Sequence, residues 1–550
     1  MKRLFSLLLL LSVAFGLQAQ ISHDADGTKY WVQFTDKNNS PYSIDYPEVY
    51  LSERALQRRA NQGIAIDMFD IPVNPQYLQA VAATGATLIH PSKWLNGVTI
   101  LTESQEVLDA IRALDFVESL RYCPNNPKAP EWKEPDFERN YRALDEVASR
   151  GYYGRAYTQI NQLNGIPLHD SGFRGEGMVI AVLDGGFEGA DTHPAFNNMR
   201  EEGRLLGTRS YVNPGQSVYQ GSGHGTSCLS TMAGYVPQEY VGTAPKASYY
   251  LLHTENTRGE NLIEEYNWVS AAEYADSLGV DVCSTSLGYV DFDDGTWNYT
   301  HDDLDGHTAP MSIGAGIACS RGMLCVNSAG NDGDSGVFPW IGIPADVEDV
   351  LTIGAVDGDG VRAGFSSIGP TADERIKPDV MAMGAGTYVA EPSGGYRSGN
   401  GTSYSCPVTA GMVACLWQSH PMATAAEIRE AVRKASNRHD NPDIYYGHGI
   451  PDFYKALDLM PVIDYPTDTK ELIDVYPNPA KGNVRVKMKE GVEADITVID
   501  CWGRCLYAYH FNGLNHTTLE NRLNELSAGV YFLTACSQRG NQTLKLVVLR

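Results

Sequence analysis

Between residues 151 and 460, short and almost wholly apolar segments alternate with helical stretches, and this pattern constrains the fold most. Residues 179–183 and 324–327 are two such segments, and residues 262–277 and 311–321 have helical character. A strand that is apolar along its whole length is buried on both faces. Its alternation with helices predicts an α/β domain with a parallel sheet and helices on both faces. Ligands of such sheets bind beyond the carboxyl ends of the strands.

Four polar residues stand at the ends of these predicted elements. Asp184 follows one buried strand and precedes two glycines, and Asn331 follows another. His224 lies between glycines ahead of a predicted helix, for which Thr226 is a candidate cap, and Ser403 begins a second helix beside Thr402. Taken singly, each has an ordinary structural interpretation as a turn former, a loop histidine or a helix cap.

Together the four residues suit acyl transfer. A helix start offers free backbone N–H groups and a favourable dipole to negative charge, which an oxyanion beside Ser403 needs. The side-chain amide of Asn331 can donate to the same oxyanion, and loss of one such donor costs about 2.7–4 kcal/mol in the barrier. A histidine oriented by a carboxylate is the usual general base for a serine nucleophile.

The order along the chain is Asp184, His224, Asn331, Ser403, in the local frames Leu-Asp-Gly-Gly, Gly-His-Gly-Thr, Ser-Ala-Gly-Asn and Gly-Thr-Ser, with Pro407 four residues after the serine. These motifs resemble the subtilisin-like serine proteases (subtilases), whose triad runs in the order Asp, His, Ser. The resemblance implies a serine endopeptidase acting on proteins or peptides, with Asp184, His224 and Ser403 as triad and Asn331 in the oxyanion hole. It implies no cofactor for the chemistry.

The resemblance extends to a substrate-binding segment, with two departures elsewhere. The segment resembles the family's edge strand, which pairs with extended substrate backbone, and consists of Ser284, Thr285, Ser286, Leu287 and Gly288. Gly185 stands where many relatives have Ser or Thr, so we expect one local hydrogen bond of Asp184 to be missing. Cys406 precedes Pro407 where a small or hydroxyl residue is more usual.

Subtilases often bind calcium, and three stretches of this chain offer clustered carboxylates. These are residues 291–295, 302–306 and 332–334. Calcium sites need clustered oxygen ligands. The alternative, a solvated acidic loop, remains open, so structural calcium is an expectation without an assigned ligand set.

The N-terminus has the pattern of a secretory signal peptide. Lys2 and Arg3 precede an apolar run over residues 4–17, and we place cleavage after Ala19. The run is too short to cross a hydrocarbon core of about 30 Å comfortably. We find no later segment that is long and apolar enough, so we expect no transmembrane segment in the mature chain.

Residues 20–122 are expected to form a small α+β domain that resembles the subtilase prodomain. A stable accessory domain is the alternative. Residues 123–150 are rich in Pro, Asn and charged residues and predict a linker or cleavable junction, so we expect a zymogen. The predicted strands are residues 30–34, 86–91, 98–101 and 117–122, and the predicted helices are 52–62, 77–84 and 104–114.

Residues 461–550 change to short alternating segments, which predict a β-sandwich. Residues 475–480 (Val-Tyr-Pro-Asn-Pro-Ala), 526–532 and 545–550 resemble the sorting domain read by the type IX secretion system of Bacteroidota. The resemblance implies that the machinery of that system is a partner. The protein would pass through the periplasm and be released or held at the outer surface. An ordinary β-sandwich binding module is the alternative.

Charge and cysteine content exclude other classes. The net charge of −25 disfavours nucleic acid and anionic membranes as partners. Ten cysteines in 550 residues do not make a disulfide scaffold, although Cys501 and Cys505 flank a turn-like segment that a disulfide can close. The functional alternatives are a surface binding protein on an inactive protease scaffold and an esterase.

Overall fold

The computed structural model describes residues 28–123, 151–213, 215–460, 472–481, 483–489, 494–500, 505–511, 516–537 and 540–549. The predicted signal peptide, the junction at 124–150 and the Cys501 end of the suggested disulfide lie outside these residues. The chain divides into two units, one ending at Leu459 and one beginning at Met460, and each is described by itself. In the described part of the chain, no helix combines the length and apolarity that a membrane crossing requires.

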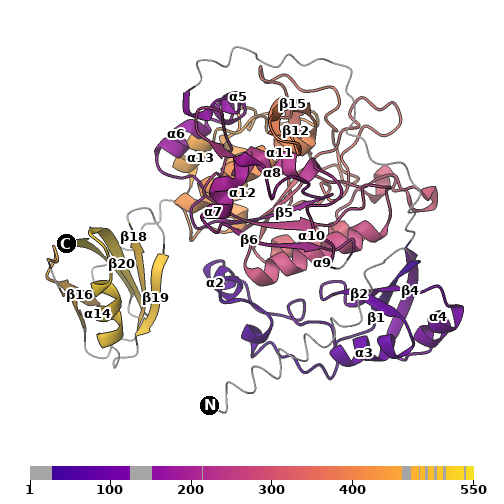
Figure 1. Ribbon diagram of the computed structural model, residues 1–550, viewed down its shortest axis with the longest axis horizontal. Helices are drawn as coiled ribbons and strands as arrows, with labels where there is room; N and C mark the ends of the chain where they lie inside the picture. The colour runs from indigo at the N-terminus through magenta and orange to yellow at the C-terminus, as the bar shows by residue number, and fades with distance from the viewer. Residues whose placement is uncertain are drawn as a thin grey trace. The chain divides into compact units, whose positions relative to one another are not determined.

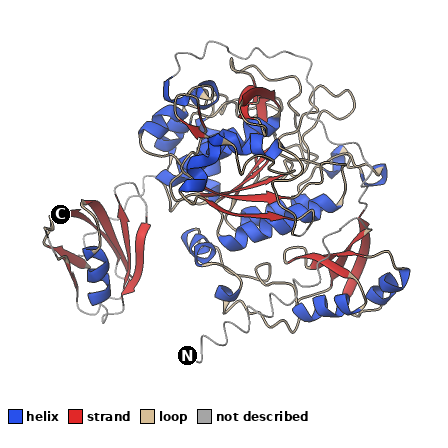
Figure 2. Cartoon of the chain, viewed as in Figure 1, coloured by secondary structure: helices blue, strands red, loops and turns tan. Residues whose placement is uncertain are grey.

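The main unit is built on a seven-stranded sheet in the order β13-β12-β11-β10-β5-β9-β6 (Figures 1 and 2). Each neighbouring pair is parallel, which confirms the predicted α/β architecture. The strands are β5 (Val179–Asp184), β6 (Leu205–Ser210), β9 (Ser248–His253), β10 (Val282–Thr285), β11 (Leu324–Ser328), β12 (Leu351–Val356) and β13 (Val380–Met383).

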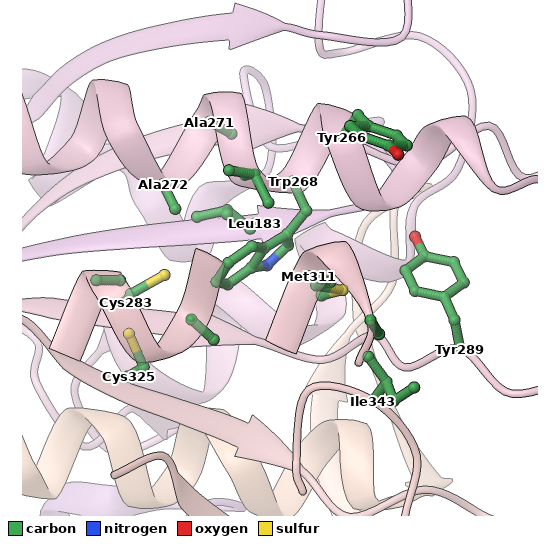
Figure 3. Close-up of a cluster of buried hydrophobic side chains, with 14 of the residues drawn as sticks. Leu183, Tyr266, Trp268, Ala271, Ala272, Cys283, Tyr289, Met311, Cys325 and Ile343 are labelled. Carbon is green, nitrogen blue, oxygen red and sulfur yellow. The ribbon is translucent and has the colours of Figure 1, made fainter. Parts of the chain in front are cut away.

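Helices cover both faces of this sheet, with α9 and α10 on one side and α8 and α11 on the other (Figure 1). The core between the sheet and α9 is drawn in Figure 3, where Trp268 lies among Leu183, Cys283 and Met311. The Trp268 indole N–H donates to Thr285 Oγ1 at 3.0 Å, which ties α9 to β10. The remaining elements of this part are α5 (Tyr157–Asn161), α6 (Gly165–Asp170), α7 (Asn197–Glu201), α8 (His224–Ala233), α9 (Ile263–Leu278), α10 (Pro310–Ser320), α11 (Thr402–Ser419), α12 (Ala425–Ala435), α13 (Phe453–Leu459), and the pairs β7 (Tyr235–Val236) with β8 (Tyr240–Val241) and β14 (Ala385–Ala390) with β15 (Tyr396–Asn400).

The N-terminal domain contains every helix and strand predicted for it. Its four strands form a sheet in the order β2-β3-β1-β4 with antiparallel neighbours. Ser52 and Ser104 cap two of its helices by accepting backbone N–H bonds, as short hydroxyl residues do at such positions. The elements are β1 (Lys29–Phe34), α2 (Glu53–Asn61), α3 (Pro75–Ala83), β2 (Thr87–Ser92), β3 (Gly97–Leu101), α4 (Gln105–Arg112) and β4 (Val117–Cys123).

This domain packs against the seven-stranded part of the same unit through its sheet and through helix α2. Its sheet packs on α9, where Trp31 stacks on Tyr266 with ring centroids 4.6 Å apart. Helix α2 contacts the chain just ahead of β10 and β11, because Arg54 Nε donates to Gly279 O and Gln62 Nε2 to Gly322 O. Helix α2 therefore lies at the amino ends of these strands, opposite the edge at which ligands of such sheets bind.

The C-terminal unit is rich in sheet. Strands β16 (Ile473–Tyr476) and β17 (Arg485–Met488) form one pair, and β19-β18-β20-β21 form a second, antiparallel sheet. The predicted strands are present as β17, β18, β20 and β21. Helix α14 (His516–Asn524) was not predicted, although Leu519 and Leu523 bury one helical face. The other strands are β18 (Ala494–Asp500), β19 (Cys505–Phe511), β20 (Gly529–Ser537) and β21 (Gly540–Val548).

Candidate active site

Asp184 is the last residue of β5, at the carboxyl end of the central sheet, and its side chain is fully buried. Its Oδ1 accepts from His224 Nδ1 at 2.7 Å and from the Gly185 N–H at 2.7 Å. Among the described residues, Oδ2 has no hydrogen-bond partner. This is the local bond expected to be missing, because Gly185 has no hydroxyl to donate.

His224 is the first residue of α8 and is oriented by Asp184. Because the carboxylate only accepts, Nδ1 carries the proton and Nε2 is the ring nitrogen that can act as a base. Burial acts to lower the pKa of His224, but Asp184 and Cys228 together outweigh it and raise that pKa well above its usual value. The expectation that Thr226 caps the helix is wrong, since its hydroxyl donates to Glu188 O at 2.7 Å.

Ser403 is the second residue of α11, and the N-cap is Gly401 at φ 152°. The Ser403 backbone oxygen accepts from Ser286 Oγ at 2.8 Å and from Cys228 Sγ at 3.3 Å. The same Cys228 sulfur lies 3.8 Å from His224 Nδ1 and 3.9 Å from Nε2. Cys228 therefore touches both His224 and Ser403, which brings the two residues to one place.

Asn331 is held against the start of α11. Its Oδ1 accepts from the Thr402 N–H at 2.8 Å, which directs Nδ2 away from Thr402. A Cβ placed on Gly401 would lie 3.7 Å from Ser403 N and 3.9 Å from Asn331 Nδ2. Two N–H donors thus border the same space beside Gly401. Thr402 does not cap α11, because its hydroxyl lies against Gly330 O and Asn331 Oδ1.

The predicted substrate segment is only partly accessible. Ser284 and Thr285 lie in β10, between β5 and β11, and each is 1% exposed. Placing them on an edge strand is wrong, because both edges of β10 are already hydrogen-bonded to neighbouring strands. Ser286, Leu287 and Gly288 follow the strand, and Gly288 is exposed.

The acidic stretches examined for calcium use their carboxylates in local turns. Asp294 accepts from Thr296, and Asp305 accepts from the N–H groups of His307 and Thr308. In the described residues, the cluster with metal-ligand spacing is Asp184, His224 and Cys228, which lies in the candidate active site. Calcium binding stays a prediction.

Two features of the site were missed from the sequence. Cys228 follows His224 by four residues on one helix, a spacing that places both on one face and was available as a signal. The second is Glu255, which is 8% exposed and lies close to Gly185. Nothing in its local sequence marks it, because its position depends on how the loop after β9 folds back.

Comparison with known proteins matches three family models to this chain. The subtilase family model matches residues 175–449, the Bacteroidota peptidase S8 propeptide domain matches 29–136, and the secretion system C-terminal sorting domain matches 474–549. The last match indicates secretion or attachment at the outer surface.

Two curated relatives and one solved structure are also similar to this chain. Subtilisin NAT from Bacillus subtilis subsp. natto is 32% identical over 294 residues, which cover 53% of this chain and 68% of the relative. Serine protease AprX from Bacillus subtilis (strain 168) is 29% identical over 302 residues, covering 49% and 64%. The solved structure of prenylagaramide maturation protease PagA is 22% identical with a TM-score of 0.42, covering 54% of this chain and 98% of that one. The chain belongs to the subtilase family of serine endopeptidases and carries a propeptide domain of the Bacteroidota type.

Proposed function

We propose that the protein is a secreted endopeptidase that hydrolyses peptide bonds with Ser403 as nucleophile, His224 as general base and Asp184 as the group that orients the imidazole. The observation that carries the proposal is the 2.7 Å bond from His224 Nδ1 to Asp184 Oδ1 at the carboxyl end of β5. It leaves Nε2 as the proton acceptor, while Cys228 holds the Ser403 backbone against the same histidine.

The reaction follows from these positions. Ser403 Oγ attacks the scissile carbonyl carbon while His224 Nε2 takes its proton, and the imidazolium is stabilised by Asp184. His224 then gives that proton to the leaving amine, which leaves an acyl-enzyme on Ser403 that water hydrolyses by the same route. The negative oxygen of each tetrahedral intermediate is stabilised by the Ser403 N–H and Asn331 Nδ2, which border the space beside Gly401.

We propose that Ser286 to Gly288 bind the substrate backbone as an added strand. Main-chain pairing of this kind tolerates many substrate sequences. The exposure of Gly288 supports the proposal, whereas buried Ser284 and Thr285 are left out of it.

We propose that the N-terminal domain is removed during maturation by cleavage between residues 123 and 150, and that the C-terminal unit is read by type IX secretion machinery. N-terminal sequencing of the secreted, active protein tests the first point. Deletion of residues 471–550 tests the second, because it should trap the protein in the periplasm, and unchanged export would contradict it.

Ser403→Ala tests the catalytic assignment. We expect casein hydrolysis to fall by about 10⁴- to 10⁶-fold with unchanged thermal unfolding, since the side chain makes one 3.3 Å contact to Ser286 O. A folded Ser403→Ala protein that still cleaves casein contradicts the proposal.

A further inference from the structure

Three carboxylates gather beside the catalytic residues: Glu255, Glu260 and Glu264, here called the acidic cluster. Glu255 follows β9, which pairs with β5 so that His253 lies opposite Asp184. Its Oε2 lies 3.2 Å from the position that a Cβ on Gly185 would take. The acidic cluster therefore adjoins the carboxyl end of β5, where the proposed chemistry takes place.

Gly185, the residue that departs from the family pattern, makes room for this arrangement. A Cβ there would come within 2.7 Å of Thr257 Cγ2 as well as close to the Glu255 carboxylate. A side chain at residue 185 would therefore force Thr257 or Glu255 to shift, so the glycine makes room for the loop after β9. The departure at Gly185 and the position of Glu255 are parts of one local structure.

Glu255 is buried without a partner. It is 8% exposed, and among the described residues no hydrogen-bond donor reaches its carboxylate. Burial, Glu260 and Asp184 all raise its pKa, and His224 is the one charge that acts to lower it. Burial and Asp293 raise the pKa of Glu260 to about 7. Glu264 differs, because it accepts backbone N–H bonds from Asn256 and Asn261 at 2.5 and 2.7 Å.

Tyr289 supplies a second, independent observation. It is 1% exposed, and within the described part of the chain its hydroxyl has no hydrogen-bond partner. The charged groups that act on this hydroxyl include all three members of the acidic cluster. Its ring belongs to the apolar core and stacks on Phe292, and in Figure 3 its hydroxyl lies on the α9 side. Buried polar groups are nearly always paired, so an unpaired hydroxyl beside an unpaired carboxylate indicates a position for a ligand.

We propose that the acidic cluster receives the ammonium or guanidinium group of a substrate lysine or arginine that lies close to the scissile bond. This inference rests on the proposed function and adds a substrate class to it. A cationic side chain supplies positive charge near Glu255, where His224 is the one charge that acts to lower the pKa of this carboxyl. Bonds between charged groups are shorter and stronger than neutral ones, and an unpaired buried charge is costly.

The spacing of the carboxylates favours a side chain over a metal ion. In the described residues, only Asp184, His224 and Cys228 approach one another closely enough to share an ion. The carboxylates of the acidic cluster are spread more widely. A guanidinium spans such a spread because it presents five N–H donors in a planar fork, and a lysine ammonium presents three on a flexible stem.

The first experiment profiles cleavage by the mature, secreted wild-type enzyme on peptides from a denatured protein mixture. We expect lysine and arginine to be enriched at one fixed position relative to the cleaved bond. Equal use of basic and neutral residues at every position near the bond overturns the inference. This experiment needs no variant and so does not depend on whether a substituted protein folds.

The second experiment compares Glu255→Gln with the wild type on two peptides that differ only in lysine or norleucine at that position. We expect kcat/KM to fall by about tenfold more for the lysine peptide than for the norleucine peptide. Glu201→Gln is the matched control, because it removes the same charge from an exposed position on α7. Equal changes for both peptides overturn the inference, as does thermal stabilisation by calcium that Glu255→Gln abolishes while the preference for lysine is kept.

Labelling with a fluorophosphonate separates failure of this inference from failure of the proposed function. Wild type that is labelled at Ser403 but shows no preference for basic residues overturns the inference alone. Wild type that neither labels nor cleaves overturns both.

Discussion

Helix α9 carries a buried carboxyl group near each of its ends, and the negative charge of the two groups is offset in different ways. Near the C-terminal end, Asp276 is fully buried and contacts Arg58, Arg59 and Lys93 at 2.5, 2.9 and 3.1 Å. In the first turn, Glu264 is equally buried, but its charged neighbours are Glu260 and Glu255.

The pKa values of the two carboxyls shift in opposite directions. Burial raises the pKa of both groups, but the three basic side chains overcome it at Asp276 and hold that pKa below its usual value. At Glu264, burial and the neighbouring carboxylates raise the pKa well above its usual value, against two backbone hydrogen bonds. Burial alone therefore does not decide the charge of a carboxyl, and the neighbours do.

The cations at the C-terminal end come from a part of the chain that the propeptide model covers. We infer that the N-terminal domain supplies the cations that pair with Asp276. A substrate supplies the cation for the acidic cluster near the other end of α9. The predictions below change one group at a time to test that contrast.

The largest effect is expected at Asp184, the carboxylate near the acidic cluster that accepts a hydrogen bond from His224 Nδ1. Asp184→Asn should lower kcat by about 10⁴-fold, because the imidazole loses the acceptor that fixes its tautomer. In the wild type, the raised pKa of His224 places the acid limb of kcat/KM above pH 6.5, since the base must be neutral. A pH profile of both proteins checks this, and an acid limb below pH 6 in the wild type would contradict it.

The next effect is expected at the paired end of α9. Asp276→Ala in the full-length Ser403→Ala protein should lower the free energy of unfolding by about 3–5 kcal/mol, because it leaves Arg58 buried without its carboxylate and Arg59 with Asp70 in place of two carboxylates. Denaturant unfolding measures this. A loss below about 1 kcal/mol would mean that water replaces the partner, and the contrast between the two ends would fail.

A smaller effect of opposite sign is expected at Glu260. Its pKa in the folded protein is about 7, so the folded state holds a proton that the unfolded chain releases near the usual value of 4.5. Stability from this group is full below pH 4.5 and is lost as the pH rises through 7. Glu260→Gln should therefore reduce the drop in unfolding free energy between pH 5 and pH 8. An unchanged drop would show that Glu260 is not proton-bound in the folded protein.

The smallest effect is expected for an exposed pair on α12. Glu430 and Lys434 lie 3.3 Å apart with side chains 47% and 52% exposed. Glu430→Gln should change the unfolding free energy by less than about 0.5 kcal/mol, because water screens such pairs. Thermal unfolding checks this, and a loss near that of Asp276→Ala would show that pairing, with no contribution from burial, explains the contrast.

The sequence predicted the features that depend on residues close to one another in the chain. Apolar periodicity gave the strands around Asp184 and Asn331, and the glycine-rich frames marked His224 and Ser403. The helix predicted from residue 52 is present, and Ser52 caps it, because capping depends only on the next few residues.

What the sequence did not predict depends on which segments become neighbours. The sequence around Ser284 and Thr285 fits an edge strand and a central strand equally well, and only the strand order decides between them. The partners of Asp276 lie more than 180 residues away in the chain. Glu255 becomes distinctive only when its loop packs on Gly185.

The most direct test of this account is to identify the residue that a fluorophosphonate modifies in the mature, secreted protein. Mass spectrometry of the digested, labelled protein should find the phosphonyl group on Ser403, and Asp184→Asn should slow the labelling. Modification of a different residue, or casein hydrolysis by a protein that does not label, would contradict the assignment of Ser403 as the nucleophile.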